Sequence, residues 1–253
     1  QDRLGPNHYL TGYYLDALAN LFLRANDVPT AEAEQVLNEA LQIERTVFGA
    51  DNARIVATEA DLGTLYDREG DTTRAIAATQ TALKITQDRL GPNHYLSGYY
   101  LDALANLFLK ANDLPTAEAD ARQALAVYAQ ALPARHLFIA STHQVLGEVL
   151  LRRGSLAAAE AELRAALDMT VGLAGAESWR TARTEASLGW ALIQRDKAVE
   201  GEPMLLAARA KLLASVGPQH PATQQATARL VEYYRAHHRD ADAARVLAAP
   251  DKR

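Results

Sequence analysis

Large and small apolar residues recur along the chain at a nearly constant spacing. Six times, a leucine is followed by a residue that is small in five of the six cases, and a large apolar residue comes four positions after the leucine. This i, i+1, i+4 pattern places the three side chains on one helical face, where the small residue lets a second helix approach closely. The anchor leucines are spaced by 44 residues once and by 42 thereafter, at Leu18, Leu62, Leu104, Leu146, Leu188 and Leu230.

A second apolar pattern follows each anchor and predicts a second helix. Small residues recur at 42-residue intervals, at Ala75, Ala117, Ala159, Gly201 and Ala243. A further alanine comes seven residues later in most repeats, at Ala82, Ala124, Ala166 and Ala208, with Ala40 in line before them. Turn-forming segments such as REGD, KAND and RRGS separate the two patterns. Each repeat is therefore predicted to be a helical hairpin that packs on its neighbours, because a single hairpin cannot bury both faces.

The spacing divides the chain into six predicted repeats that form a single array over residues 1–253. Residues 1–4, QDRL, equal the end of the second helix of the second repeat, so we interpret them as the stub of a preceding helix. A longer parent protein is expected on that interpretation. The approximate bounds of the repeats are 5–48, 49–90, 91–132, 133–174, 175–216 and 217–253.

Two repeats are far more similar than stacking requires. Residues 1–33 match residues 87–119 except at three positions, which are Thr11/Ser97, Arg24/Lys110 and Val28/Leu114. The other repeats share only the anchor pattern. A recent natural duplication and an engineered or spliced chain would both produce this near-identity.

Two repeats depart from the pattern in ways that bear on their helices. The first repeat has two extra residues between Ala31 and Ala40, which predicts either a bulge in its second helix or a longer turn. The fifth repeat contains Gly201 and Pro203, which are expected to weaken the start of its second helix unless Pro203 lies in the first turn.

The combined pattern resembles the tetratricopeptide repeat, in which Leu-small-x-x-aromatic, a turn and two alanines seven residues apart follow one another. Its period of 42 residues is longer than the usual period of about 34. Together with LGPNH, LGPNH and VGPQHP before the first helix, it is similar to the kinesin-light-chain variety, and the resemblance spans essentially all 253 residues. The resemblance implies an all-α fold, a right-handed α-solenoid of about six stacked hairpins.

Composition narrows the class of partner. The formal net charge is −5, from 26 Lys and Arg against 31 Asp and Glu, which disfavours nucleic acid because phosphate binding needs clustered cations. No apolar run reaches the roughly 18 residues that span a membrane, so no membrane insertion is expected. Cysteine is absent, which excludes disulfides and thiolate chemistry. We expect a cytoplasmic location, although the absence of cysteine does not fix the compartment.

Histidine recurs in the loop before the first helix, at His8, His94, His136 and His220. Equivalent residues of stacked repeats lie roughly 10 Å apart or more, which is too far for a shared metal ion. We therefore expect these histidines to cap or pack against the first helix. No zinc-protease, phosphate-loop or serine-hydrolase motif is present. The sequence predicts no catalytic residue, no metal site and no cofactor.

The resemblance implies that the first helices line a concave groove, at fixed offsets from the anchor leucine. In the first repeat these offsets select Tyr13, Asp16, Asn20 and Arg24. In the third they select Tyr99, Asp102, Asn106 and Lys110, so the duplication presents the same polar and aromatic set twice. The other repeats contribute Thr64, Asp67, Arg68, Glu148, Arg152, Arg183 and Trp190.

Two features of this set have a structural and a functional interpretation. The basic row Arg24, Arg68, Lys110 and Arg152 either compensates the helix dipole, at a few tenths of a kcal/mol per residue, or forms a track for acidic side chains or a peptide carboxylate. The aromatic set Tyr13, Tyr99 and Trp190 would anchor a bound segment. Because consecutive tyrosines cannot both face inward, we expect one residue of each pair Tyr13–Tyr14 and Tyr99–Tyr100 to pack in the interior.

Chaperone-binding members of the family hold a terminal carboxylate with Lys and Asn from successive first helices. Here Asn20 and Asn106 match the Asn position, but Asp16 and Asp102 occupy the Lys position. Binding of that kind of chaperone tail is therefore not expected.

These observations predict a non-catalytic interaction module that binds a protein or an extended peptide in its groove, within a larger signalling or scaffold protein. The alternative is a structural array that associates with itself, as a homodimer through its end faces or through a swapped hairpin. An enzyme with a groove carboxylate such as Asp102 in its active site is a third alternative.

Overall fold

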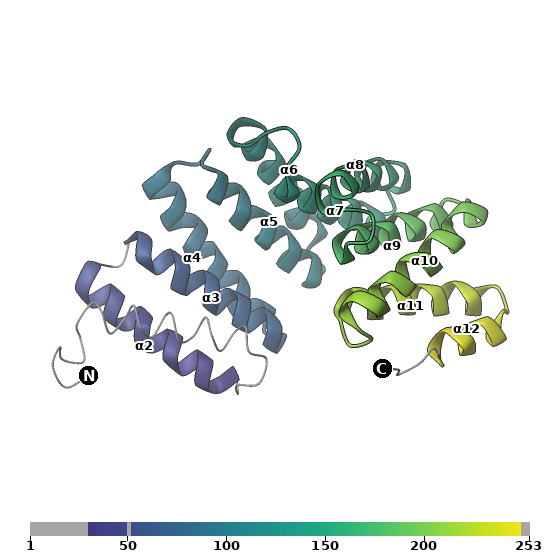
Figure 1. The fold of residues 1–253 in the computed structure, drawn as a ribbon. Coiled ribbons are helices and arrows are strands. Elements are labelled where there is room, and N and C mark those ends of the chain that lie inside the picture. The colour runs from purple at the N-terminus through teal and green to yellow at the C-terminus, as the bar shows by residue number, and fades with distance from the viewer. Residues whose placement is uncertain (1–29, 50–51, 249–253) are drawn as a thin grey trace. The chain divides into compact units, whose positions relative to one another are not determined.

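The computed structural model describes residues 30–49 and 52–248, and these residues form α-helices joined by short turns (Figure 1). No strand occurs within these two ranges, so the predicted all-α repeat fold is confirmed. The helices are α2 (Thr30–Phe48), α3 (Ala53–Glu69), α4 (Thr72–Leu90), α5 (Tyr95–Lys110), α6 (Leu114–Ala131), α7 (Leu137–Arg152), α8 (Leu156–Ala174), α9 (Trp179–Gln194), α10 (Ala198–Val216), α11 (Pro221–Ala236) and α12 (Asp240–Leu247).

The chain forms two compact units, residues 1–131 and 132–253, which we call unit 1 and unit 2. Unit 1 includes α2 to α6 and unit 2 includes α7 to α12. Within each unit, every described helix packs against the next one in the sequence. From residue 52 onward, each predicted repeat contains two helices, and the division between the units lies within one residue of a predicted repeat boundary. The single array remains a prediction.

The anchor residues form the interior of each unit. Leu146, Leu188 and Leu230 are fully buried, and so are alanines of the second helices such as Ala159 and Ala208. Removing such a leucine side chain from water contributes about 1.5–3 kcal/mol. The 42-residue pattern thus marks the residues that hold the hairpins together.

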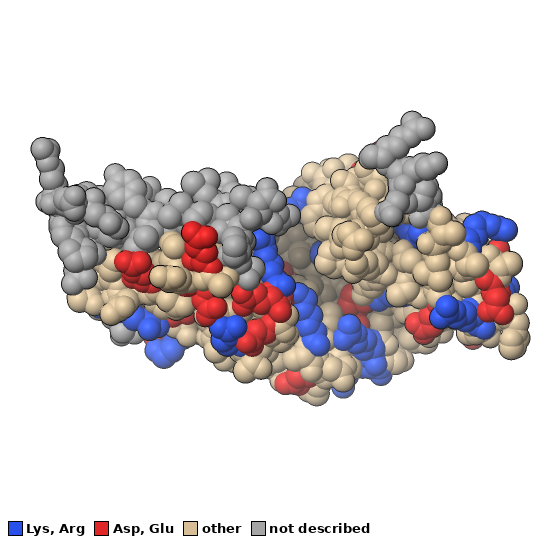
Figure 2. Space-filling view, turned by 90° about the horizontal axis from the view of Figure 1, so that it is seen from below, with Lys and Arg blue, Asp and Glu red and all other residues tan. Residues whose placement is uncertain are grey.

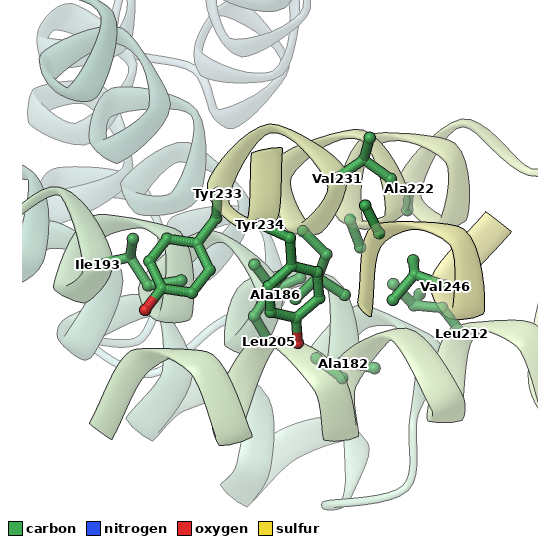
Figure 3. Packing of buried hydrophobic residues seen from close by; sticks show 14 residues of the cluster. Ala182, Ala186, Ile193, Leu205, Leu212, Ala222, Val231, Tyr233, Tyr234 and Val246 are labelled. Carbon is green, nitrogen blue, oxygen red and sulfur yellow. The ribbon is translucent and has the colours of Figure 1, made fainter. Parts of the chain in front are cut away.

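One hydrophobic cluster in unit 2 joins α9, α10, α11 and α12 (Figure 3). Tyr233 and Tyr234 extend from α11 into it, and Tyr234 points toward Leu205 and Ala186 (Figure 3). The corresponding cluster in unit 1 joins α2, α3 and α4 with Leu107 of α5. In both units, therefore, the apolar core continues from one hairpin into the next.

The turn inside each hairpin uses a left-handed backbone conformation at one register position. The φ angle is +80° at Gly70 and +75° at Gly154, where glycine meets no steric penalty. In the other hairpins this position is Asn112, Asp196 or His238, with φ between +56° and +61°. Asn and Asp visit this region more readily than other side chains. The repeat period thus includes a backbone requirement as well as an apolar pattern.

Histidine caps three of the first helices, as the sequence predicts. The Nδ1 atoms of His94, His136 and His220 accept hydrogen bonds from the backbone N–H two residues later, at 3.3, 3.1 and 3.2 Å. Asn52 and Ser178 accept the equivalent bond at 3.0 and 3.3 Å. Each cap satisfies one N–H that has no partner inside its helix. His8 lies outside the described residues.

Helix α10 corrects the expectation for the fifth repeat. The helix begins at Ala198 and continues through Pro203, which lies beyond the first turn. Proline removes the hydrogen bond to the carbonyl of Val199, but that residue is exposed and its carbonyl can bond to water. Gly201 explains how the helix is held: a Cβ atom there would lie 2.5 Å from the carbonyl oxygen of Gly189, so two glycines let α9 and α10 approach closely.

The first repeat resolves the other irregularity. Helix α2 is continuous, and Ala33 and Ala40, seven residues apart, are both buried. Ala31, which the sequence pattern placed at the first small position, is exposed. A bulge in the second helix is therefore excluded, and the two extra residues lie before Ala33.

Matching sets of three side chains link successive hairpins in both units. In each set, a tyrosine hydroxyl donates to a glutamate of the preceding helix, at 3.2 Å in unit 1 and 3.0 Å in unit 2. An arginine binds the same glutamate, at 2.6 and 2.8 Å, and stacks on the tyrosine ring. The sets are Glu34, Tyr66 and Arg74 in unit 1, and Glu202, Tyr234 and Arg239 in unit 2.

Candidate functional site

The predicted groove residues of the third repeat lie on one face of α5. Tyr99, Asp102, Asn106 and Lys110 are spaced i, i+3, i+7 and i+11, which one face of a helix presents. The Tyr99 side chain is 43% exposed and Tyr100 is 6% exposed, so one tyrosine faces solvent and the other packs in the interior, as predicted for this pair. Burial raises the pKa of Tyr100 to about 12.

Lys110 connects the end of α5 to the preceding first helix. Its Nζ atom donates to both carboxylate oxygens of Asp67 on α3, at 2.6 and 2.7 Å. The two side chains are 53% and 31% exposed, and a pair this exposed contributes about 0–1 kcal/mol. Thr64 and Arg68 on α3 are also exposed. The face of α3 and α5 that carries these residues, which we call the groove face of unit 1, is therefore open to solvent.

The basic row has the geometry of dipole compensation. Arg68, Lys110 and Arg152 each lie in the last turn of a first helix, and each is exposed. Cations at this end of a helix interact favourably with the partial negative charge of the terminal carbonyls. A role as a track for acidic side chains remains a prediction. The predicted residues of the first repeat, Tyr13, Asp16, Asn20 and Arg24, lie outside the described part of the chain.

Unit 2 has a different arrangement, in which Glu148 is buried at the centre of a polar network. Arg229 of α11 binds the two carboxylate oxygens through its two terminal nitrogens, at 3.1 and 2.5 Å. The hydroxyl of Ser187 on α9 donates a short hydrogen bond to the same carboxylate. Burial raises the pKa of Glu148, but the charge and hydrogen bonds of Arg229 outweigh burial and hold the pKa below its usual range.

Trp190 and Arg183 lie on the face of α9 that carries Ser187, one turn to either side of it. Trp190 is half-buried, and the Arg229 guanidinium carbon lies 5.9 Å from its ring centroid. Arg183 is half-buried and lies 5.6 Å from the ring of Trp179. The face of α7, α9 and α11 around Glu148, which we call the groove face of unit 2, therefore has a buried ion pair at its centre.

Sequence analysis missed Ser187 and Arg229. Both occupy the position just before the anchor leucine, where the other repeats have Ala17, Asp61, Ala103 and Val145. An arginine at that position in the sixth repeat was the available signal. It indicated an unusual residue, but not that a glutamate 81 residues earlier would be its partner.

Charged side chains of both signs are mixed over the face that Figure 2 shows, rather than gathered in patches of one sign. In residues 30–49 and 52–248, no group of three His, Asp or Glu side chains is placed to hold a metal ion. Within the same ranges, no helix has the length and apolar character needed to cross a membrane.

Comparison with known families identifies one repeat directly. The family model for the tetratricopeptide repeat matches residues 98–137, which span α5, α6 and the start of α7. The resemblance inferred from the anchor pattern is confirmed over this segment. A comparison with curated proteins finds no match.

Solved structures extend the likeness in fold to most of the chain. BtubC (BKLC) from P. vanneervenii is 20% identical, with a TM-score of 0.67 over 90% of this chain and 96% of that one. A kinesin-light-chain-like protein from Podosopora anserina with nearly identical TPR-like repeats is 16% identical, with a TM-score of 0.65 over 80% and 95%. A Rap protein complexed with Competence and Sporulation Factor is 13% identical, with a TM-score of 0.66 over 94% and 74%. At these identities the likeness establishes the fold.

Proposed function

We propose that this chain, a tetratricopeptide-type repeat protein by its matched repeat and its fold, binds a protein or an extended peptide along the groove face of unit 1. Repeat proteins of this kind generally mediate protein–protein interaction and are typically not catalytic. A parent protein with a signalling or scaffold role fits such a module, and that step rests on analogy between folds.

The open face of α5 is the observation that carries the proposal. Tyr99 offers a large exposed ring at one end of the face and Lys110 an exposed cation at the other, with the half-buried Asp102 and Asn106 between them. Aromatic and cationic side chains on a rigid scaffold suit binding because little conformational freedom is lost when a partner docks. A Rap protein of similar fold, solved in complex with Competence and Sporulation Factor, gives this use of the fold a parallel.

A screen of a displayed peptide library against the purified chain tests the proposal. Peptides selected on the wild type are expected to bind Tyr99→Ala and Lys110→Glu at least about tenfold more weakly, or 1.4 kcal/mol. Lys84→Glu is the matched control, because Lys84 is an exposed lysine on the second helix α4 and makes a similar ion pair with Asp88 at 2.7 Å. Equal binding by all three variants would contradict the proposal.

Self-association is the competing function, and light scattering over a wide range of protein concentrations distinguishes it. A mass equal to one chain at all concentrations supports the groove face as the working surface. A dimer that survives dilution and is unaffected by Lys110→Glu with Arg152→Glu would transfer the function to another surface of the chain.

A further inference from the structure

Arg229 holds Glu148 in the way that an arginine holds the carboxylate of a binding partner. Its two terminal nitrogens meet the two carboxylate oxygens, at 3.1 and 2.5 Å, and this paired geometry is the preferred mode of carboxylate recognition by arginine. The carboxylate comes from α7, so it reaches α11 across the intervening first helix α9. Ser187 of α9 adds a third hydrogen bond. Arg229 and Ser187 together thus donate three hydrogen bonds to one carboxylate on the groove face of unit 2.

Glu148 has a second cation within reach. Arg152 lies four residues later on α7, and its charge contributes to lowering the pKa of Glu148. Glu followed by a cation at i+4 is the favourable order for a side-chain pair on a helix. A Glu148 carboxylate displaced from Arg229 would therefore still have one cation near it, which reduces, without removing, the cost of breaking a buried ion pair.

The charged side chains around Glu148 favour an acidic binding partner. Arg152, Arg183 and Arg229 lie on this face, against the carboxylates of Glu148 and the exposed Glu232. Among these five side chains the arginines outnumber the glutamates, in a chain whose formal net charge is −5. Trp190, half-buried beside Arg229, offers a flat surface next to the guanidinium.

Resting on the proposed function, we propose that Arg229 is a second contact point for the partner: a carboxylate site that Glu148 fills in the free protein and that an Asp or Glu side chain of an acidic partner fills in the complex. Glu148 acts as a built-in competitor and moves to Arg152 when it is displaced. The apparent affinity for an acidic segment is then the intrinsic affinity multiplied by the fraction of molecules in which Glu148 has left Arg229.

Binding of a fluorescent octaglutamate peptide with a C-terminal amide, measured by anisotropy at about 0.15 M salt, tests this site. Glu148→Gln weakens the competitor and is expected to bind the peptide about tenfold more tightly than the wild type does. Glu232→Gln is the matched control, since it makes the same charge change at the same register position of α11 and should alter affinity by less than about twofold. Glu148→Gln with Arg229→Gln should lose the gain.

Each outcome decides the matter. A gain with Glu148→Gln that disappears in the double variant supports the carboxylate site. Binding by Glu148→Gln that is no tighter than by Glu232→Gln overturns it, as does the absence of binding by every variant.

A second variant covers the case in which Glu148→Gln does not give a folded circular-dichroism spectrum. Arg152→Gln then replaces it and is expected to bind the peptide more weakly, because displaced Glu148 loses its second partner. Unchanged binding overturns the proposal. Library-selected peptides that depend on Tyr99 and Lys110 would leave the proposed function standing in any of these cases.

Discussion

The groove faces of the two units use the same kind of ion pair in opposite ways. In unit 1, Lys110 binds Asp67 of the adjacent first helix, and both side chains remain in contact with water. In unit 2, Arg229 binds Glu148 two first helices away, and these side chains are only 12% and 8% exposed. The exposed pair leaves both of its side chains in water, whereas the buried pair joins three helices.

This difference shows that the position of a residue in the repeat does not determine whether its side chain is exposed to solvent. Thr64, Asn106 and Glu148 share one offset from the anchor leucine, yet Thr64 is exposed, Asn106 is half-buried and Glu148 is buried. Whether each of these side chains can contact a partner depends on the residues that neighbouring helices place opposite it. Substitutions in both units test this contrast.

Arg229→Ala should have the largest effect, because it leaves the charge of Glu148 buried without its main partner. We expect the free energy of unfolding of unit 2 to fall by about 3–5 kcal/mol. Both tryptophans, Trp179 and Trp190, lie in unit 2, so urea unfolding followed by tryptophan fluorescence reports this unit. A loss below about 1 kcal/mol would place the pair in the same energetic class as Lys110 and Asp67.

Gly201→Ala should come next, since the added methyl group meets the backbone of α9. A Cβ atom would lie 2.5 Å from the Gly189 carbonyl oxygen and 2.9 Å from the backbone nitrogen of Ile193. We expect a loss of about 1–3 kcal/mol in urea unfolding, despite the better helix propensity of alanine. Ala117→Gly is the reciprocal change at the same position in unit 1, and it should cost about 1 kcal/mol through helix propensity. A stabilising Gly201→Ala would show that α9 and α10 separate without cost.

Two buried carboxylates, one in each unit, should contribute to the acid response with opposite signs. Burial raises the pKa of Glu160, but hydrogen bonds from Lys197, Arg164 and Arg195 lower it to about 2. Because the folded pKa lies below the usual 4.5, this carboxylate stabilises unit 2 above pH 4.5, and the contribution is lost as the pH falls toward 2. Glu160→Gln should therefore flatten the loss of stability of unit 2 in acid, measured as the urea midpoint at successive pH values by tryptophan fluorescence.

Glu59 in unit 1 provides the contrast. Burial raises its pKa more than the nearby Arg45 lowers it, so its contribution is largest in acid and is lost as the pH rises through the raised pKa. Glu59→Gln should make the acid-induced loss of stability steeper, measured as the urea midpoint by circular dichroism. Equal pH profiles for the Glu59 and Glu160 variants would contradict the opposite pKa shifts assigned to these two carboxylates.

The histidine caps should behave alike in the two units and so serve as a reference. His94→Ala on α5 and His136→Ala on α7 each remove the acceptor of one N-terminal N–H. Each should lower the thermal midpoint through a loss of about 1 kcal/mol, which His→Asn should restore because Asn52 makes the same bond. Unequal losses would mean that the environment of the cap, rather than its hydrogen bond, sets the effect.

Lys110→Ala should have the smallest effect, about 0–1 kcal/mol, because water already screens its pair with Asp67. The small loss should disappear in about 1 M salt, whereas the loss caused by Arg229→Ala should persist. Urea unfolding by circular dichroism at low and high salt checks both statements. A large, salt-insensitive effect of Lys110→Ala would remove the distinction between the two groove faces.

Local regularities explain how much of the fold could be predicted. The anchor leucines, the small residues beside them and the turn residues repeat every 42 residues, and each acts on residues near it in the sequence or in the next hairpin. The histidine caps were predictable for the same reason, because the bond joins a side chain to the backbone N–H two residues later. Pro203 was misjudged because its effect depends on exposure at Val199 and on the glycine contact with α9, which no local pattern contains.

The sequence by itself determined the helical hairpins, their order and the residues that could line a groove, since helix pairing follows a short-range period. Tertiary structure decided which of the described groove residues face solvent. Glu148 and Arg229 are 81 residues apart, and their contact arises from the way three first helices pack within one unit. Because the pair is buried, removing either side chain would leave the other charge out of water without its partner, which is costly. The same offset in unit 1 meets no such partner within the described residues, and that face remains open.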